Sequence, residues 1–390
     1  MPKRTNLLLL GASLLVGLAA VETMLRFADL SYPEFHRLDP MQGWSPRPGV
    51  EGWWNLEGGA YLAINREGFR DREHSLAKPA GGFRIAVLGD SYTEARAIPT
   101  EKTFWSILER RLKTCAALAG RPVEVLNFGV SGYGTTQELI TLRRHVLKYR
   151  PDLVLLAFYA GNDVWNNSRA LDRHPDRPYL VMRDGAPVID RAFRDTARFR
   201  SKLVWQDVKH GVVNSLYVLQ LLKEGYHRLK VRLTGKYAAA RAALDQPAPP
   251  DAVYLPPPDA TWREAWRVTE QAIGLIHAEA RAAGAAFWLA LLSTPIQVHP
   301  DPAVRARFLD RLGGGDLAYP DRRLAAFAGR QGIPVVTLAP DLREYAQANH
   351  VYLHGFAGAA PGTGHWNATA HALAGARIAR TICAALGGAD

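Results

Sequence analysis

Four residues that lie far apart in the chain have side chains or backbone groups that could together perform acyl-transfer chemistry. Ser91 follows a Gly-Asp pair, and His365 stands between a glycine and a tryptophan. A serine hydroxyl becomes a nucleophile when an imidazole within hydrogen-bonding reach takes its proton. Gly132 and Asn162 could offer a backbone amide and a carboxamide to a developing oxyanion. The residue types therefore suggest nucleophilic catalysis, provided that the fold brings them together.

Each of these residues also has an ordinary structural explanation when it is taken alone. Ser91 could cap a helix, and the glycines around Gly132 could form a plain turn. Asn162 is of a type that turns favour, and a single histidine such as His365 is commonly part of a polar surface. Only their joint placement in the fold predicts a function.

Short apolar runs that alternate with amphipathic segments predict the elements that would position these residues. Strands are expected over residues 84–88, 123–127, 153–158, 286–292 and 334–338. Helices are expected over residues 103–118, 136–148, 262–283, 302–312, 321–331 and 367–386. This alternation predicts an α/β fold in which helices cover both faces of a five-stranded parallel sheet.

The four residues occupy corresponding places in this predicted fold. Ser91 follows the first strand, Gly132 the second and Asn162 the third, whereas His365 comes just before the last helix. Ligands of open parallel sheets bind beyond the carboxyl ends of the strands, so we expect these residues to meet at one edge. The N-terminus of the last helix would favour the neutral imidazole of His365, which is the form that a general base needs.

The four short blocks together resemble those of the SGNH (GDSL-like) hydrolase family, in the same order, over roughly residues 83–386. The resemblance implies a flavodoxin-like three-layer α/β/α sandwich and ester hydrolysis or acyl transfer. It implies that Ser91 is the nucleophile and His365 its base. Residues 65–71 are also similar to a segment of membrane-anchored bacterial members of this family.

The same resemblance implies the groups that would bind the oxyanion, which are the backbone amides of Ser91 and Gly132 and the side chain of Asn162. Asp90 and Asp163, which adjoin two of these residues, are expected to support the site. No cofactor and no metal are expected, because the spacing of His and Cys fits no zinc motif and no phosphate-binding loop is found.

One position departs from the family pattern. The family has an aspartate three residues before the histidine, where this chain has Gly362. In a catalytic triad the acid orients the imidazole and stabilises its charged form. Three interpretations stay open: a Ser–His dyad with a backbone carbonyl on the histidine, a substitute carboxylate such as Asp341 or Glu344, or an inactive homologue.

Three functions stay open. The first is an esterase that removes O-acyl groups, specifically O-acetyl groups, from cell-envelope or exported carbohydrate or from another small ester. The second is a polysaccharide O-acetyltransferase that uses the same serine and histidine. The third is a catalytically inactive binding protein of the envelope.

The N-terminus predicts export. Lys3 and Arg4 precede an apolar run over residues 7–21, which Glu22 interrupts before the apolar pattern continues. This pattern is typical of a signal anchor, which would hold the protein in the inner membrane, or of a cleaved signal peptide, which would release it. The basic residues keep the N-terminus in the cytoplasm, so the rest of the chain is expected outside it, in the periplasm of a Gram-negative cell.

Three regions are expected along the chain. Residues 1–30 form the signal segment, residues 31–80 an irregular lead-in with a hairpin, and residues 81–390 the hydrolase domain. Residues 165–260 interrupt the strand–helix alternation as an insertion. Within the insertion, residues 216–233 predict an amphipathic helix, which is either packed on the domain or serves as a lid or membrane-surface helix.

Composition excludes one class of partner and leaves the redox state open. The formal net charge of +11 is spread over the chain without a run of adjacent Lys and Arg, and no nucleic-acid-binding signature occurs, so nucleic acid is not an expected partner. Cys115 and Cys383 could be two buried thiols. They could also form one disulfide, because the first and last helices of this topology can lie side by side.

Overall fold

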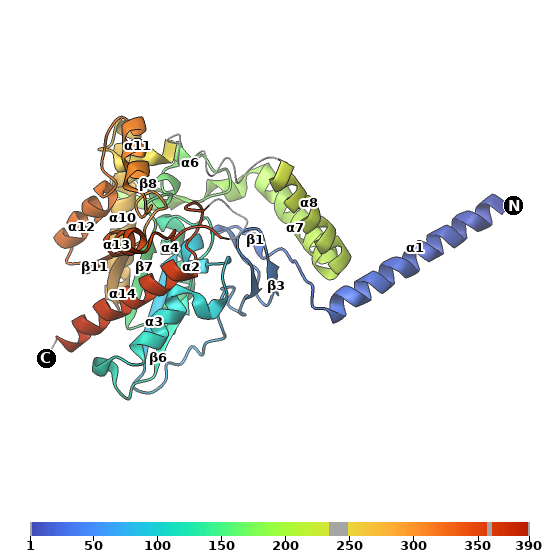
Figure 1. The fold of residues 1–390 in the computed structure, drawn as a ribbon, viewed down its shortest axis with the longest axis horizontal. Helices are drawn as coiled ribbons and strands as arrows, with labels where there is room; N and C mark the ends of the chain where they lie inside the picture. Colours follow the sequence, from blue (N-terminus) through green and yellow to red (C-terminus); the bar gives the residue numbers. More distant parts are fainter. Residues whose placement is uncertain (1, 234–248, 357–360, 389–390) are drawn as a thin grey trace.

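A parallel sheet lies at the centre of the molecule (Figure 1), in a computed structural model that describes residues 2–233, 249–356 and 361–388. The five strands lie in the order β11-β10-β7-β5-β6, and every neighbouring pair is parallel. Their bounds are β5 (Phe83–Gly89), β6 (Val123–Asn127), β7 (Leu153–Phe158), β10 (Ala286–Leu291) and β11 (Val335–Thr337). This is the flavodoxin-like strand order, so the predicted fold class is confirmed.

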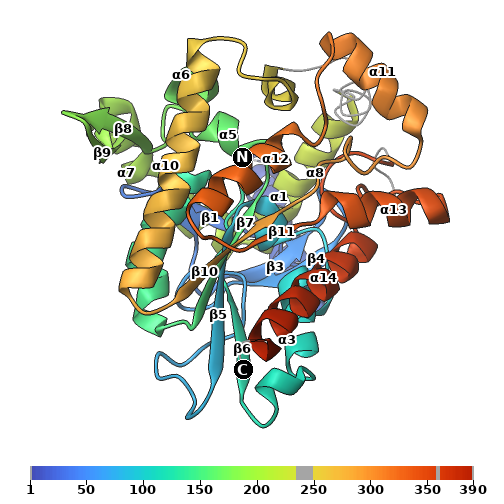
Figure 2. The same cartoon turned by 90° about the vertical axis from the view of Figure 1, so that its left-hand side faces the viewer.

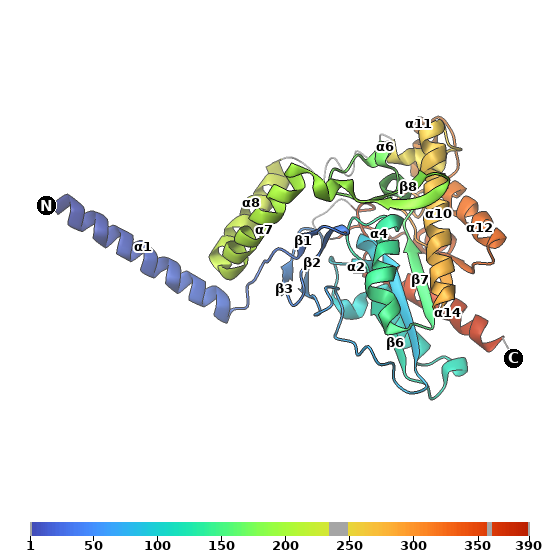
Figure 3. The same cartoon turned by 180° about the vertical axis from the view of Figure 1, so that it is seen from behind.

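Helices cover both faces of the sheet (Figures 2 and 3). One face carries α3 (Phe104–Leu112), α13 (Ala339–Asn349) and α14 (Ala368–Gly387), and the other carries α4 (Thr135–Thr141), α10 (Ala260–Ala282) and α12 (Tyr319–Arg330). In β5, Ile85 and Val87 join one core cluster, while Ala86 and Leu88 join the other. Because both faces are buried, the strands are apolar throughout, which is why the sequence pattern revealed them.

The lead-in is more regular than the sequence indicated. It contains two antiparallel hairpins, whose strands are β1 (His36–Asp39), β2 (Gly43–Pro46), β3 (Glu51–Trp54) and β4 (Ala60–Ala63). A small core of its own holds it together, made of Phe35, Ala60, Leu62 and Ile64. The lead-in is therefore a packed part of the structure.

The insertion builds a third hairpin of strands and a pair of long helices. After the short helices α5 (Asp163–Asn166) and α6 (Arg169–Asp172) come β8 (Tyr179–Arg183), β9 (Ala186–Asp190), α7 (Ala197–Ser215) and α8 (Tyr217–Leu233). The helix expected over residues 216–233 is thus α8. Buried Gln220 on α8 accepts hydrogen bonds from the lead-in, at 2.6 Å from the backbone nitrogen of Tyr32. Leu222, Tyr226 and Leu229 are exposed, so only one face of α8 is packed.

The first helix, α1 (Pro2–Phe27), extends away from the rest of the molecule (Figures 1 and 3). Its residues Arg4–Phe27 have a mean hydropathy of 2.0 and are long and apolar enough to cross a membrane, as a signal sequence would also be. Near its end, the Glu22 carboxylate accepts hydrogen bonds from the backbone nitrogens of Tyr217 and Val218 at the start of α8. The end of α1 is therefore joined to the insertion.

A disulfide between Cys115 and Cys383 joins the region after α3 to α14. The two helices lie side by side on one face of the sheet, as the predicted topology implied (Figure 2). Of the two interpretations of the cysteines, the structure has the disulfide. The segment that follows α3 is thereby linked covalently to the last helix of the fold.

Two further helices complete the described fold. α2 (Ser91–Glu94) follows β5, and α11 (Pro302–Leu312) has the bounds that the sequence predicted. α13 was not predicted.

Candidate active site

Ser91 and His365 meet at the carboxyl end of β5. Ser91 is the first residue of α2, where Asp90 caps the helix by accepting a hydrogen bond from Tyr92 N at 2.9 Å. The Ser91 Oγ lies 2.8 Å from His365 Nε2. The two side chains are thus within proton-transfer reach, although 274 residues separate them in the chain.

The loop that carries His365 is fixed from both sides. Its backbone pairs with residues 353–355, because Gly355 N donates to His365 O at 3.0 Å and Asn367 N donates to Leu353 O at 3.0 Å. The indole of the next residue, Trp366, donates to Ser293 Oγ at 2.9 Å. These contacts hold the imidazole toward the serine.

Glu57, a residue of the lead-in, is the acid that contacts the histidine. Its Oε2 lies 2.5 Å from His365 Nδ1, and its Oε1 accepts a hydrogen bond from the backbone nitrogen of His365 at 2.8 Å. Glu57 lies between β3 and β4, and 308 residues separate it from the histidine. A carboxylate, an imidazole and a hydroxyl therefore form one hydrogen-bonded chain.

This arrangement corrects the expectations for the acid. The partner of His365 Nδ1 is a carboxylate, so the dyad with a backbone carbonyl is wrong. Neither of the two carboxylates named from the sequence is the substitute: Asp341 pairs with Arg377 at 2.8 Å, and Glu344 is exposed on α13.

Two glycines in the histidine loop explain why the acid comes from the lead-in. Gly362 has a φ of +79°, and a Cβ there would lie 2.8 Å from the Tyr352 ring, so an aspartate does not fit at that position. Gly364 has a φ of +73°, and a Cβ there would lie 2.2 Å from Glu57 Oε1. The glycine at 364 thus leaves the space that the Glu57 carboxylate occupies.

The acid and the histidine change each other's pKa. Burial opposes the charge of Glu57, but the side-chain hydrogen bond, the charge and the backbone hydrogen bond of His365 together outweigh burial and lower the pKa of Glu57. Burial likewise opposes protonation of the imidazole, but the hydrogen bond and charge of Glu57 outweigh it and raise the pKa of His365. The pair therefore favours a charged imidazolium beside a carboxylate, which is the state that follows proton abstraction from serine.

The groups expected to bind an oxyanion lie around the same serine. The N–H groups of Ser91 and Gly132 donate no hydrogen bond to any residue that the structure describes. The Asn162 Nδ2 donates to Asp90 Oδ2 at 3.1 Å, which leaves its second hydrogen for another acceptor. Ser131, the neighbour of Gly132, lines the same pocket as Ser91.

The Gly132 loop is held by contacts that the sequence did not reveal. Trp44 of β2 donates through its indole nitrogen to Ser131 O at 3.0 Å, and Glu94 accepts from Ser131 N at 2.7 Å. Gly132 has a φ of +77°, and a Cβ there would lie 3.3 Å from the Trp44 ring. The lead-in therefore buttresses the loop as well as supplying the acid.

Asp90 and Asp163 are both fully buried beneath the site. Asp90 joins Asn162 to the start of α2, as described above, whereas Asp163 accepts from Tyr159 N at 2.8 Å and does not contact Ser91 or His365. Burial raises the pKa of Asp90. Burial, with the nearby charges of Glu138 and Asp90, also raises the pKa of Asp163 well above its ordinary value. Both aspartates thus hold backbone and side chains in place.

Arg70 is a further positioning residue, and it belongs to the segment that resembles anchored family members. It is fully buried and donates to the backbone carbonyls of Glu94, Ala95 and Ile98. The next residue, Asp71, accepts from Asn127 N at 2.8 Å at the end of β6. This segment therefore holds both α2 and the second strand where the site requires them.

The space at Ser91 is small. It measures about 40 Å3 and is lined by Trp54, Glu57, Ser91, Tyr92, Ala95, Arg96, Ala97, Ser131, His365 and His371. Across the described parts of the chain, no group of three or more His, Cys, Asp or Glu side chains could hold a metal ion. What the described residues offer is an acid, a base, a hydroxyl and free amide groups.

Comparison with known proteins gives distant structural likenesses. No family model and no curated protein matches the chain. Its structure is similar to an acetyl xylan esterase, with 12% identity, a TM-score of 0.39 and coverage of 77% of this chain and 100% of that one. An acetylxylan esterase from Geobacillus stearothermophilus is also similar, with 14% identity, a TM-score of 0.39 and coverage of 78% of this chain and 96% of that one.

A lipolytic protein of the G-D-S-L family from Desulfitobacterium hafniense is also similar, with 14% identity and a TM-score of 0.36 over 77% of this chain and 99% of that one. Likenesses at this level do not establish an activity. The function must therefore be judged from the chain's own residues.

Proposed function

We propose that the protein is a serine ester hydrolase of the SGNH type that cleaves small O-acyl esters. Ser91 is the nucleophile, His365 the general base, and Glu57 the acid that orients the imidazole. The observation that carries the proposal is the hydrogen-bonded chain from Glu57 through His365 to Ser91, at the edge of the sheet where α/β folds bind their ligands.

In the first half of the reaction, His365 Nε2 takes the hydroxyl proton as Ser91 Oγ attacks the acyl carbon of the ester. The carbonyl oxygen becomes an oxyanion, which the N–H groups of Ser91 and Gly132 and the Asn162 amide stabilise. The C–O bond to the alcohol then breaks, and His365 returns its proton to the leaving alcohol. An acyl-serine remains.

In the second half, His365 takes a proton from water, and the resulting hydroxide attacks the acyl-serine. The same donors stabilise the second oxyanion. Ser91 leaves with the proton from His365, and the carboxylic acid is released. Throughout, Glu57 stabilises the imidazolium that forms in each half.

The acyl group that suits this site is short. The space of about 40 Å3 at Ser91 has room for about three water molecules, since a water needs about 10–15 Å3 of such volume. It suits an acetyl group rather than a long acyl chain. Acetyl esters of cell-envelope or exported carbohydrate are the proposed substrates.

The proposed location is the outer face of the membrane, with α1 as the anchor. The apolar, unburied α1 and the disulfide between Cys115 and Cys383 support this location, because disulfides persist in oxidising compartments. Glu57 weakens the case for an inactive homologue, because that case rested on the missing aspartate at position 362.

The test is ester hydrolysis by the full chain in detergent. We expect release of p-nitrophenol from the acetate ester, labelling by a fluorophosphonate probe, and loss of both in Ser91→Ala by at least about a thousandfold in rate. Ser201→Ala, which removes an exposed hydroxyl on α7, is the matched control and should keep full activity. Activity that survives Ser91→Ala would exclude Ser91 as nucleophile. Acetyl transfer to added glycan, with little free acetate, would instead identify a transferase.

A further inference from the structure

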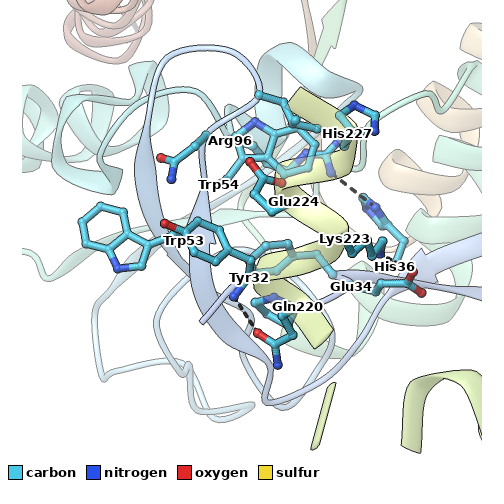
Figure 4. Close-up of a pocket in the computed structure, with 14 residues that line it drawn as sticks. Tyr32, Glu34, His36, Trp53, Trp54, Arg96, Gln220, Lys223, Glu224 and His227 are labelled. Atoms are coloured by element: carbon cyan, nitrogen blue, oxygen red, sulfur yellow. Dashed lines mark hydrogen bonds and ion pairs between the residues drawn. The ribbon is translucent and has the colours of Figure 1, made fainter. Parts of the chain in front are cut away.

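A second pocket, which we call the outer pocket, lies beside the candidate active site (Figure 4). Its volume is about 360 Å3, within the range of roughly 300–1,000 Å3 that small-molecule sites have. Its walls are residues 32–36 and 53–56 of the lead-in, Arg96, and one face of α8. The lead-in and the insertion, rather than the sheet and its covering helices, therefore build most of this pocket.

The outer pocket adjoins the space at Ser91. Trp54 and Arg96 line both, and the Arg96 guanidinium carbon lies 4.1 Å from the centroid of the Trp54 ring. Glu57 follows three residues after Trp54. A ligand in the outer pocket would therefore lie next to residues that also line the space at Ser91.

The lining of the outer pocket combines aromatic rings with hydrogen-bonding groups. Tyr32 and Trp54 supply the rings, whereas the exposed indole of Trp53 points away from them (Figure 4). Asn55 and His227 supply polar groups along the same walls. A sugar ring has an apolar face of C–H bonds and a rim of hydroxyls, so it can pack on such rings and hydrogen-bond to such side chains.

The charges around the outer pocket are paired with one another. Glu34 forms ion pairs with Lys209, at 2.8 Å, and with Lys223. Glu224 pairs with Arg228 at 2.8 Å, and Arg96 pairs with Glu94 at 3.5 Å. A charged ligand would have to compete with these pairs, whereas an uncharged one would not. The pocket therefore favours a neutral ligand.

From these contacts we infer that the outer pocket binds the carbohydrate part of the substrate, as a neutral sugar ring whose acetyl group reaches Ser91. This inference rests on the proposed esterase function. Tyr32 packs on the sugar, His227 hydrogen-bonds to its hydroxyls, and both are positioning residues that take no part in the bond-making steps. The insertion thus contributes specificity through α8.

The test compares two esters of the same acid with the full chain in a zwitterionic detergent, because sugar-based detergents would compete. One substrate is an O-acetylated xylo-oligosaccharide, as a neutral carbohydrate probe, and the other is p-nitrophenyl acetate. In Tyr32→Ala and in His227→Ala we expect KM for the carbohydrate ester to rise roughly tenfold, the equivalent of about 1.4 kcal/mol. Kinetics with p-nitrophenyl acetate should not change.

Matched controls separate this role from general damage. Trp205→Ala removes an exposed tryptophan from α7, and Leu229→Ala removes an exposed side chain from α8; neither lines the outer pocket. Both should leave the two KM values unchanged. Binding of the same oligosaccharide to Ser91→Ala, which cannot turn it over, gives a dissociation constant that Tyr32→Ala should raise by a similar factor.

Three results would overturn the inference. They are an unchanged carbohydrate KM in both pocket variants, a wild-type enzyme that shows no preference for the carbohydrate ester, or a preference for octanoyl over acetyl esters that Tyr32→Ala abolishes. The last result would assign the pocket to an acyl chain. If the wild type hydrolyses neither acetate ester, the esterase proposal itself fails, which is a different outcome.

Discussion

At the scale of single residues, one carboxylate holds His365 at two points. Glu57 contacts the ring nitrogen Nδ1 and the backbone nitrogen of the same histidine. The first contact sets the tautomer in which Nε2 is free to accept the Ser91 proton. The second fixes the backbone that carries the ring. A single side chain from the lead-in thus determines both the chemistry and the position of the base.

Replacing this carboxylate tests its role. In Glu57→Gln the amide can still hydrogen-bond, but it cannot stabilise the imidazolium by charge and can favour the wrong tautomer. We expect kcat/KM for p-nitrophenyl acetate to fall by about 10²- to 10⁴-fold with the fold intact by circular dichroism. Asp341→Asn is the control and should retain wild-type activity, since Asp341 pairs with Arg377. Equal activity in the two variants would show that Glu57 has no role in the reaction.

The pH dependence follows from the pKa of His365. The base must be neutral, so kcat/KM is lost as the pH falls through this pKa, which Glu57 raises above the ordinary value of 6.5. In Glu57→Gln, burial lowers the pKa of His365 and only the charge of Asp90 still opposes it, so the acid limb of the residual activity should move to lower pH. A pH–rate profile of both proteins measures this shift. An acid limb that stays in place or moves upward contradicts the predicted coupling.

The residue types of the site could be predicted from the sequence, but its acid could not. Short motifs beside predicted elements mark the other four residues of the site, which are Ser91, Gly132, Asn162 and His365. Glu57 has no such marker: it lies between two short strands, far from any predicted strand–helix unit. Nothing in the sequence distinguishes it from other surface carboxylates, because its role depends on a contact across 308 residues.

At the scale of elements, the histidine loop excludes an acid at its usual family position. Both the positive φ of Gly362 and the nearby Tyr352 ring oppose a side chain there. We therefore expect Gly362→Asp to give no more than a few-fold gain in kcat when it is added to Glu57→Gln. Steady-state rates of the double variant decide this. Recovery toward wild-type rates would mean that the loop can rearrange to seat an aspartate.

Arg70 connects the lead-in to the loop after α2. Arg70→Met would leave the carbonyls of Glu94 and Ile98 buried without donors, at roughly 1–3 kcal/mol for each unsatisfied group. We expect a clear drop in the thermal unfolding midpoint and weaker esterase activity. Arg66→Ala, an exposed change in the same segment, should alter stability by no more than about 0.5 kcal/mol. Equal midpoints for the two variants would contradict this role.

The strands were predictable because burial on both faces makes them continuously apolar. The predicted bounds of β6 and β7 agree with the structure. α13 was missed because Pro340 stands near its start, where proline begins a helix but is easily mistaken for a break. The hairpins of the lead-in were missed because strands of four residues give too little alternation to detect.

At the scale of the whole molecule, the lead-in cannot be separated from the rest of the fold. It supplies Glu57, Trp44 and Arg70 to the site and one wall of the outer pocket. We propose that the functional unit begins near residue 31, rather than at residue 81 where the strand–helix alternation starts.

The anchor can be tested in the intact cell envelope. We expect the full chain to sediment with membranes, to resist carbonate extraction and to keep residues 1–30 by intact mass. Leu9→Arg together with Leu14→Arg should abolish this behaviour, since an arginine at the centre of a span costs about 2.5–3.5 kcal/mol. Leu76→Arg, which changes an exposed leucine outside α1, is the control. A mature protein that lacks the first thirty residues would instead identify a cleaved signal peptide.

The short run of chain between the end of α1 and Glu57 has a consequence for which esters can be reached. Because Glu57, one wall of the outer pocket and α1 all belong to one continuous stretch, an α1 anchored in the membrane would hold the reaction centre at a nearly constant height above the lipid. Such an enzyme would act on a polymer as it emerges from the cell surface, one sugar unit after another. Acetyl groups on glycan that has already diffused away would escape it.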